Sequence, residues 1–330
     1  MIWPLLDIRL AGKVFGRKKL NGGKEMGISC SNIHRNRRIF MMPMKYYLLI
    51  LLGWAPTLLP AQQPVSYETR TAVQRTLNYY FQALHLNDLD ALARAYHPQA
   101  QFTYVQAETG TVAQFSFGRY LATRYDAATH PAHYERELTV LSLDIAGNAA
   151  WAKTAITYKK RGMRLIDYLS LVQEQGEWRI ISRVSHKEYA RFEPVSRAEQ
   201  RRQAQTAGHL RQVVKAYLTQ RRREDWDRMG QSFHPAAQVA YVDPRRQICH
   251  TASLPDYLEA LGATNRHYQR HDDILAVDHV GDIAVVKVRT QYRRLKGHTL
   301  DYLTLVREGG KWHIIHKATH KHPMAMSVPG

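Results

Sequence analysis

The sequence predicts an α+β protein made of two tandem domains, each with N-terminal helices packed on a curved antiparallel sheet. The chain has 330 residues, 45% of them hydrophobic, which is enough for two ordinary cores. The stretch DYLSLVQEQGEWRIISRVSHK at residues 167–187 recurs as DYLTLVREGGKWHIIHKATHK at residues 301–321. Within each copy, apolar residues at helical spacing precede long extended runs. This order favours helices gathered on one face of a sheet.

Residues 1–61 are expected to lie outside the folded domains. Residues 1–43 hold nine Lys or Arg without a periodic pattern, and we interpret them as an upstream extension before the true start at Met44. From Met44 the chain reads MKYYLLILLGWAPTLLPAQQP, which predicts a signal peptide at residues 44–61 and a periplasmic or secreted protein. The alternative is a basic tail followed by a membrane anchor. Because the apolar run is short and contains Pro56, no stable membrane span is expected.

Cysteine is too rare to stabilise the exported part of the chain. Cys30 lies in the upstream extension and Cys249 stands alone, so neither an intrachain disulfide nor a thiolate metal site is expected. Stability must therefore come from packed cores.

The repeat covers a whole domain rather than a short motif. Placing Asp167 over Asp301 aligns the two copies without a gap from Tyr134 and Tyr268 onward. Further upstream, HPQAQFTYV from His97 lies over HPAAQVAYV from His234 once a short length difference in the intervening loop is allowed. A unit of this size is an ordinary domain and not a solenoid repeat. We expect a first domain at residues 66–190, a polar linker at 191–205 and a second domain at 206–323.

Each domain is expected to open with helices. Apolar residues recur at helical spacing from Val73 to Leu84 and from Leu210 to Leu218, which predicts an amphipathic helix at the start of each copy. Ser196 and the glutamate three residues later form a capping box for the second of these helices. Asp88 and Asp225 are suited to begin a second, shorter helix.

The remainder of each domain is expected to be mostly strand. A strand through Phe102 and Tyr104 is followed by a short helix around Tyr120 and then by four long extended runs. Two of the runs are joined by the turn pair at residues 175–176 in the first copy and at residues 309–310 in the second.

This turn predicts which side chains share a face of the hairpin. With a regular two-residue turn, Glu174 lies opposite Glu177, and counting outward places Asp167 opposite Val184. Asp167 and His186 then share the core face with Trp178 and lie diagonally within hydrogen-bonding reach. The same count places Asp301 diagonal to His320 and leaves Lys153 and Lys287 facing away from the core.

The order of elements, the HP-x-A turn and DYLxLxxxxGxWxI followed by a basic residue and a histidine resemble the nuclear transport factor 2-like superfamily. Within it, the chain resembles the family called putative lumazine-binding proteins, over residues 68–190 and 206–322. The resemblance implies a cone-like fold whose sheet and helices enclose an apolar pocket. It also implies pairing of the two domains through their sheets, as an intrachain pseudo-dimer. No residue in the sequence identifies lumazine as the ligand.

From this resemblance we expect the cone pocket to bind a small apolar or aromatic molecule. The expected ligand-binding residues are aromatic side chains at equivalent places in the two copies, namely Tyr104, Tyr158, Trp178, Tyr241, Tyr292 and Trp312. An alternative places Trp178 and Trp312 in the core and makes Tyr104 and Tyr241 core residues with a hydroxyl at the rim.

A second function class remains open. An isomerase- or cyclase-like enzyme could use a carboxylate and an imidazole for proton transfer, and the candidates are Asp167, His186, Asp301 and His320. The Asp and His side chains could instead simply satisfy each other as buried polar groups. Catalytic residues of enzymes with this fold do not map onto matching motifs here. A non-catalytic interaction module is the third class.

No cofactor, metal or nucleic acid is expected as a partner. The 17 histidines lack a compact ligand spacing such as H-E-x-x-H. The net charge of +19 would permit nucleic-acid binding. Because the protein is expected to be exported, solvated surface or attraction to anionic envelope components explains this charge more simply.

Overall fold

The computed structural model describes residues 65–86, 88–106, 109–124, 136–189, 196–264, 269–293 and 297–322. The predicted upstream extension, the predicted signal peptide and the first part of the predicted linker lie outside the described residues. Among the described helices, none is both long enough and apolar enough to cross a membrane.

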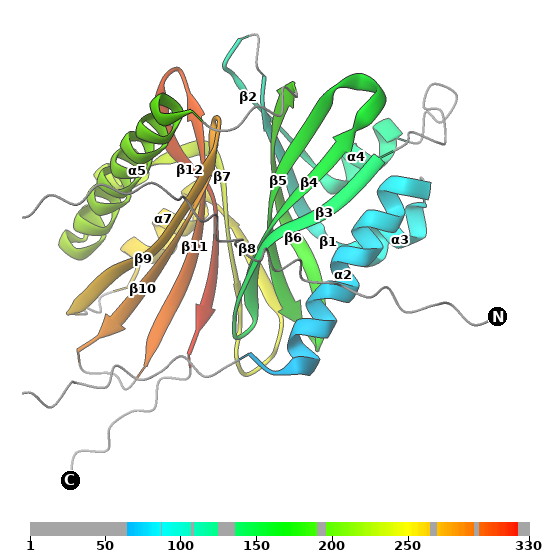
Figure 1. Ribbon diagram of the computed structural model, residues 1–330. Helices are drawn as coiled ribbons and strands as arrows, with labels where there is room; N and C mark the ends of the chain where they lie inside the picture. Colours follow the sequence, from blue (N-terminus) through cyan, green and yellow to red (C-terminus); the bar gives the residue numbers. More distant parts are fainter. Residues whose placement is uncertain are drawn as a thin grey trace, which may run out of the picture. The chain divides into compact units, whose positions relative to one another are not determined.

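The first repeat opens with two helices, and its α-helices all precede the four strands joined as hairpins, as predicted (Figure 1). Its helices are α2 (Tyr67–Leu86), α3 (Leu89–Ala95), α4 (Phe117–Arg124) and the short 3-10 helix η2 (Lys159–Arg161). Its strands are β1 (Tyr96–Val105), β2 (Val112–Ser116), β3 (Arg136–Ala146), β4 (Ala149–Tyr158), β5 (Met163–Glu174) and β6 (Glu177–Tyr189).

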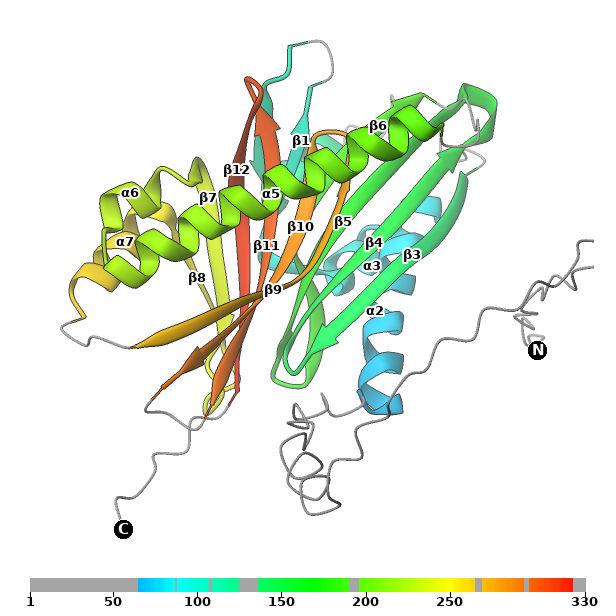
Figure 2. The same ribbon diagram turned by 60° about the vertical axis from the view of Figure 1, so that its left-hand side comes forward.

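The second repeat has the same order. Its helices are α5 (Arg197–Arg223), α6 (Trp226–Gly230) and α7 (Leu254–Gly262), and Figure 2 shows α5 as one long helix with α6 and α7 near its C-terminal end. Its strands are β7 (Phe233–Val242), β8 (Cys249–Ser253), β9 (Arg270–Val280), β10 (Ile283–Tyr292), β11 (His298–Glu308) and β12 (Lys311–Lys321).

Each repeat forms a six-stranded sheet, in the orders β2-β1-β6-β5-β4-β3 and β8-β7-β12-β11-β10-β9. The sheets are antiparallel except for the pairs β1–β6 and β7–β12, which are parallel. The predicted antiparallel arrangement therefore holds for every strand pair but this one in each copy. The parallel pair arises because β1 follows a helix and joins β6 across a long stretch of chain, whereas β3 to β6 are connected by hairpins.

Local sequence signals position the helices and the central turn as predicted. The side chains of Asp88 and Asp225 accept hydrogen bonds from backbone N–H groups at the starts of α3 and α6, and Ser196 does so at the start of α5. Gln175 and Gly176 have φ of 48° and 84°, and they place Glu174 opposite Glu177. These positive values are typical of a two-residue hairpin turn.

The register of this hairpin changes a short way beyond the turn. Leu171 pairs with Ile180 as predicted, but Ser170 pairs with Ser182, so Ile181 is an extra residue in β6. This β-bulge reverses the alternation of the side chains that follow it. The same shift occurs between Thr304 and Leu305 in the second repeat. The diagonal Asp167–His186 and Asp301–His320 pairs predicted from a regular ladder are therefore wrong.

Each repeat has its own apolar core between helices and sheet. Trp178 is 3% exposed within the first core and Trp312 is 5% exposed within the second. A third apolar cluster draws on both repeats and includes Trp151, Tyr168 and Tyr302. The sheet faces that point away from the helices therefore contact each other.

Two equivalent polar clusters flank this shared apolar cluster. Asp144 of the first repeat accepts hydrogen bonds from Lys287 Nζ (2.8 and 3.0 Å) and from the Tyr302 hydroxyl (2.8 Å) of the second. Asp278 accepts from Lys153 Nζ (2.7 Å) and from the Tyr168 hydroxyl in the same way. The two lysines face away from the cores as predicted, but they are enclosed by the other repeat. The contacts thus obey a pseudo-twofold relation within one chain.

Two histidines also contact the opposite repeat. The glycine at the tip of each β3–β4 or β9–β10 hairpin has positive φ, and a Cβ atom on Gly147 or Gly281 would overlap the ring of His320 or His186, respectively. His320 Nδ1 lies 2.6 Å from Oδ1 of Asn148. The two histidines predicted to lie on the core faces are therefore directed at the other repeat.

His316 is expected to make the protein sensitive to acid. Its side chain is 1% exposed, neither ring nitrogen has a hydrogen-bond partner among the described residues, and burial lowers its pKa to about 3. The unfolded chain therefore takes up a proton below about pH 6.5 while the folded chain does not, so stability falls as the pH drops from about 6.5 towards 3. Replacing His316 by leucine should remove up to ~1.4 kcal/mol per pH unit of this slope.

Urea unfolding between pH 7.5 and pH 4.5 measures this slope (roughly the titration range of an ordinary histidine). Because leucine leaves no unpaired nitrogen, stability at the upper pH should be equal or higher. His209→Gln, at an exposed position of α5, is the matched control and should retain the slope. An unchanged slope in His316→Leu would contradict the assignment.

Candidate functional site

Asp167 is the centre of the polar cluster inside the first repeat. Its carboxylate is 0% exposed and accepts hydrogen bonds from the Tyr80 hydroxyl of α2 (2.6 Å) and the Ser185 hydroxyl of β6 (2.5 Å). Arg183 Nε lies 3.2 Å from Oδ1. Because of the β-bulge, Arg183 and Ser185 occupy the core face where Val184 and His186 were expected. The partner of the carboxylate is thus a guanidinium and not an imidazole.

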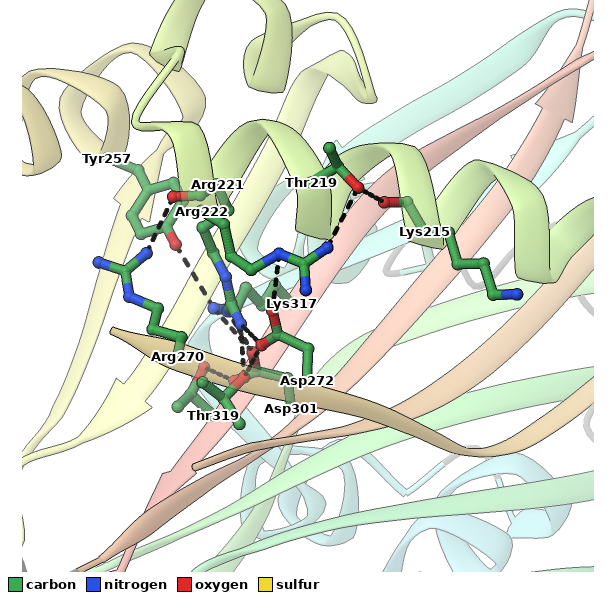
Figure 3. Close-up of polar contacts among 11 residues, drawn as sticks. Lys215, Thr219, Arg221, Arg222, Tyr257, Arg270, Asp272, Asp301, Lys317 and Thr319 are labelled. Carbon is green, nitrogen blue, oxygen red and sulfur yellow. Dashed lines mark hydrogen bonds and ion pairs between the residues drawn. The ribbon is translucent and has the colours of Figure 1, made fainter. Parts of the chain in front are cut away.

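Asp301 occupies the equivalent position in the second repeat (Figure 3). Its Oδ2 lies 3.2 Å from both Arg221 Nη1 and Lys317 Nζ, and Thr319 donates to its Oδ1 (2.8 Å). Arg221 also reaches Asp272 (2.5 Å). As Figure 3 shows, Arg221 descends from α5 between the two carboxylates, so four charged side chains are enclosed together.

The second cluster contains a trio of polar residues where the first repeat has apolar ones. Arg221, Asp272 and Thr290 bond to one another. At the corresponding positions the first repeat has Leu84, Leu138 and Ile156, which belong to its apolar core. The two cone interiors therefore differ by a coordinated exchange of three side chains. The Tyr217 hydroxyl, displaced from Asp301 by Arg221, is buried without a hydrogen-bond partner among the described residues.

Electrostatics keep these groups ionised. Burial raises the pKa of Asp301, but the stronger combined effect of Lys317, Arg221 and the Thr319 hydroxyl holds that pKa below its ordinary value. Burial opposes the charge of Lys317, yet the attraction of Asp301 raises the pKa of that lysine. Burial raises the pKa of Tyr217 to about 12. A fully paired carboxylate of low pKa is a poor proton acceptor at neutral pH.

The catalytic candidates are therefore divided between two faces. Asp167 and Asp301 lie inside the cones, whereas His186 and His320 contact the opposite repeat. Burial lowers the pKa of both histidines, to about 4 for His320. The structure does not bring any of the four into an Asp–His pair, so the geometry gives no support to the proton-transfer alternative.

The six aromatic candidates also separate. Trp178 and Trp312 are core residues. Tyr104 is 39% exposed and lies edge-on to Phe115. The Tyr241 ring has Lys321 Nζ 4.0 Å from its centroid and stacks on the His250 ring. Tyr158 and Tyr292 alone among the six line the two pockets described next.

Two pockets lie at the ends of the long strands, at equivalent places in the two repeats. The pocket of the second repeat has a volume of about 590 Å³ and that of the first about 360 Å³. Neither is lined by Asp167 or Asp301. The alignment of the two repeats relates six lining positions, which are Glu137 and His271, Thr157 and Gln291, Tyr158 and Tyr292, Lys159 and Arg293, Met163 and Gly297, and Arg164 and His298.

Arg136 and Arg270 connect the strand ends to the helices. Arg136 donates a hydrogen bond to the carbonyl oxygen of Leu84, near the end of α2. Arg270 donates to the carbonyl oxygen of Arg221, near the end of α5 (3.0 Å). The Arg136 guanidinium lies over the Tyr158 ring, 5.5 Å from its centroid. Sequence reasoning missed both arginines, although the alignment of the two repeats superimposes them.

The described residues include no group of three or more His, Cys, Asp or Glu side chains placed to hold a metal ion.

The family described as "Putative lumazine-binding" matches the chain twice, at residues 68–186 and 205–320. The chain belongs to this family. The match covers both repeats, so the predicted tandem duplication and the nuclear transport factor 2-like fold of each repeat are confirmed. No curated protein matches the chain.

The solved structures to which this chain is similar each match somewhat more than a third of it. An NTF2-like protein of unknown function from Shewanella baltica is 19% identical, with a TM-score of 0.35, and the match covers 38% of this chain and 99% of that one. An NTF2-like protein of unknown function from Silicibacter pomeroyi is 24% identical, with a TM-score of 0.32 and coverage of 37% and 97%. A ketosteroid isomerase-like protein from Erwinia carotovora atroseptica is 15% identical, with a TM-score of 0.30 and coverage of 36% and 96%.

Proposed function

We propose that the chain is an exported, non-catalytic protein that binds a small aromatic or apolar molecule. The binding sites are the two strand-end pockets rather than the cone interiors, which are occupied by the Asp167 and Asp301 clusters. The two repeats act as an intrachain pseudo-dimer, a proposal supported by the contacts of Asp144 and Asp278 across the repeats.

One observation carries this proposal. Tyr158 and Tyr292, which sequence reasoning selected as ligand-binding residues, occupy equivalent positions and both line pockets. The volume of the larger pocket is typical of small-molecule sites. A phenol ring beside a guanidinium offers a flat apolar surface together with a polar edge, which suits an aromatic ligand.

Ligand binding is expected to stabilise the full chain. Thermal melts across a library of small aromatic metabolites should find at least one that raises the Tm by about 5 °C at saturating concentration. Tyr292→Ala should abolish or strongly reduce this shift, because the substitution removes the ring from the larger pocket.

Tyr189→Ala is the matched control, since Tyr189 is 67% exposed and does not line either pocket. It should leave the shift unchanged. If no compound raises the Tm, the chain acts as an interaction module and the binding proposal fails. If Tyr189→Ala and Tyr292→Ala reduce the shift equally, the ligand binds elsewhere.

Export has a direct test. Expressed from Met44 in a bacterium, the protein should be recovered from the periplasm or medium with an N-terminus near Ala61. Recovery of the uncleaved chain from the cytoplasm or inner membrane would overturn this part of the proposal and favour the membrane-anchor alternative.

A further inference from the structure

The two strand-end pockets differ in charge at positions that otherwise correspond. In the first repeat, Glu137, Thr157, Arg164 and Glu188 lie side by side on neighbouring strands. In the second, the same places hold His271, Gln291, His298 and His322. Two carboxylates of the first repeat are thus replaced by two imidazoles in the second.

In the first pocket the charges neutralise one another. Arg164 donates two hydrogen bonds to Glu188 (3.0 and 2.6 Å), and Lys159 lies 3.2 Å from Glu137. Cations that are already paired with a carboxylate bind an anionic ligand less strongly. This pocket therefore has no electrostatic preference for an acid.

In the second pocket the cations keep no carboxylate partner inside the cavity. Among the described residues that line it, none carries a carboxylate, and Arg270 and Arg293 are both present. Arg293 donates to Gln269 Oε1 (3.0 Å) and Arg270 donates to the Arg221 carbonyl (3.0 Å), so both arginines bond to neutral oxygens. The Nε of Arg270 is buried without a hydrogen-bond partner among the described residues.

Asp273 is a carboxylate beside this pocket, and its partners are side chains other than Arg270 and Arg293. Asp273 accepts two hydrogen bonds from Arg289 (3.3 and 2.8 Å), and His271 Nε2 lies 3.2 Å from its Oδ1. The hydrogen bonds from Arg289 lower the pKa of Asp273, so this carboxylate stays ionised and bound to its own partners. It contacts His271 and Arg289, and it forms no ion pair with Arg270 or Arg293 among the described residues.

We propose that the pocket of the second repeat binds the carboxylate or phosphate group of a small aromatic acid, with Arg270 and Arg293 as the cationic partners and Tyr292 against the ring. This inference rests on the proposed function and adds the class of ligand and the choice of repeat. Guanidinium groups bind carboxylates and phosphates with paired, charge-assisted hydrogen bonds, which gives the preference for an acid over its neutral analogue. A cavity of about 590 Å³ has room for one such molecule.

Titration calorimetry of the full chain at neutral pH, with EDTA present, tests this inference. The probes are benzoate, phenyl phosphate and the neutral analogue benzamide. Benzoate and phenyl phosphate should bind at least about tenfold more tightly than benzamide. Arg293→Gln should weaken the two acids about tenfold and leave benzamide within about twofold.

Variants at corresponding positions of the first repeat and charge-matched variants of His271 provide the controls. Lys159→Gln, the equivalent of Arg293→Gln, should weaken the two acids much less than Arg293→Gln does, because Lys159 already contacts Glu137. His271→Glu should weaken the acids by about tenfold because it places a carboxylate in the pocket, whereas His271→Gln should change them by less than about twofold. Both His271 and Arg293 are exposed, so these variants are expected to fold.

The outcomes separate the inference from the proposed function. Equal binding of benzoate and benzamide would overturn the anion preference while the proposed function stands. If no aromatic probe and no library compound binds, both the anion preference and the proposed function are overturned. If Lys159→Gln weakened the acids as much as Arg293→Gln, the anion site would not be in the second repeat and the inference would fall.

Discussion

Replacing Asp301 by alanine is expected to destabilise the protein by about 3–5 kcal/mol. The carboxylate is 0% exposed and lies 3.2 Å from both Arg221 and Lys317, whose side chains are 7% exposed. Its removal leaves Arg221 with Asp272 as its ionic partner and leaves Lys317 without a carboxylate partner among the described residues. Urea unfolding of the variant against the native chain at neutral pH measures the loss of stability.

Two further variants identify buried, uncompensated charge as the cause. Asp273→Ala removes a carboxylate that is 32% exposed and should cost no more than about 1 kcal/mol. The triple change Arg221→Leu, Asp272→Leu and Thr290→Ile installs the residues of the first repeat and removes opposite charges together. It should be neutral or stabilising, because well-packed apolar residues replace a buried ion pair at no net cost. A large loss in the triple variant with a small loss in Asp301→Ala would contradict this account.

Gly147→Ala and Gly281→Ala are each expected to cost about 2–4 kcal/mol, from left-handed strain and from overlap with a half-buried ring. Gly147 has φ of +54° and Gly281 has φ of +53°, and the added methyl group meets the imidazole of His320 or His186 from the other repeat. The loss should appear as a lower Tm of the whole chain, because the contact joins the two repeats.

The strain and the overlap can be separated. Gly162 has φ of +55° and nothing within 4 Å of an added Cβ, so Gly162→Ala should cost only about 1–2 kcal/mol. Combining Gly147→Ala with His320→Ala should recover part of the loss, since the ring is no longer in the way. If Gly147→Ala cost no more than Gly162→Ala, the contact between the repeats would be absent in solution.

Much of the fold could be predicted because its signals are local. The apolar spacing from Val73 to Leu84, the capping residues Asp88, Ser196 and Asp225, and the turn at residues 175–176 each act through nearby backbone, and each is found in the structure. Because the sequence contains two copies of the domain, each pattern could be compared with its equivalent, and the order of elements was the same in both.

The candidate site could not be predicted because one extra residue changed the face of every side chain after it. Regular alternation placed His186 and Val184 with Asp167, whereas the bulge at Ile181 places Arg183 and Ser185 there. A signal was present, since two consecutive isoleucines follow the tryptophan in both copies and interrupt the alternation. The Arg221 trio had no local signal, because its members come from α5, β9 and β10 and meet only in the folded domain.

Fusion of the two repeats into one chain has a consequence for how each half can vary. In a homodimer every substitution occurs twice, so a change on one side is also imposed on the other. Here Asp144 and Asp278 keep matched roles at the contact, while Arg221, Asp272 and Thr290 occur in one half alone. Covalent linkage thus allows the interiors of the two repeats to diverge separately while the contact between the repeats stays symmetric.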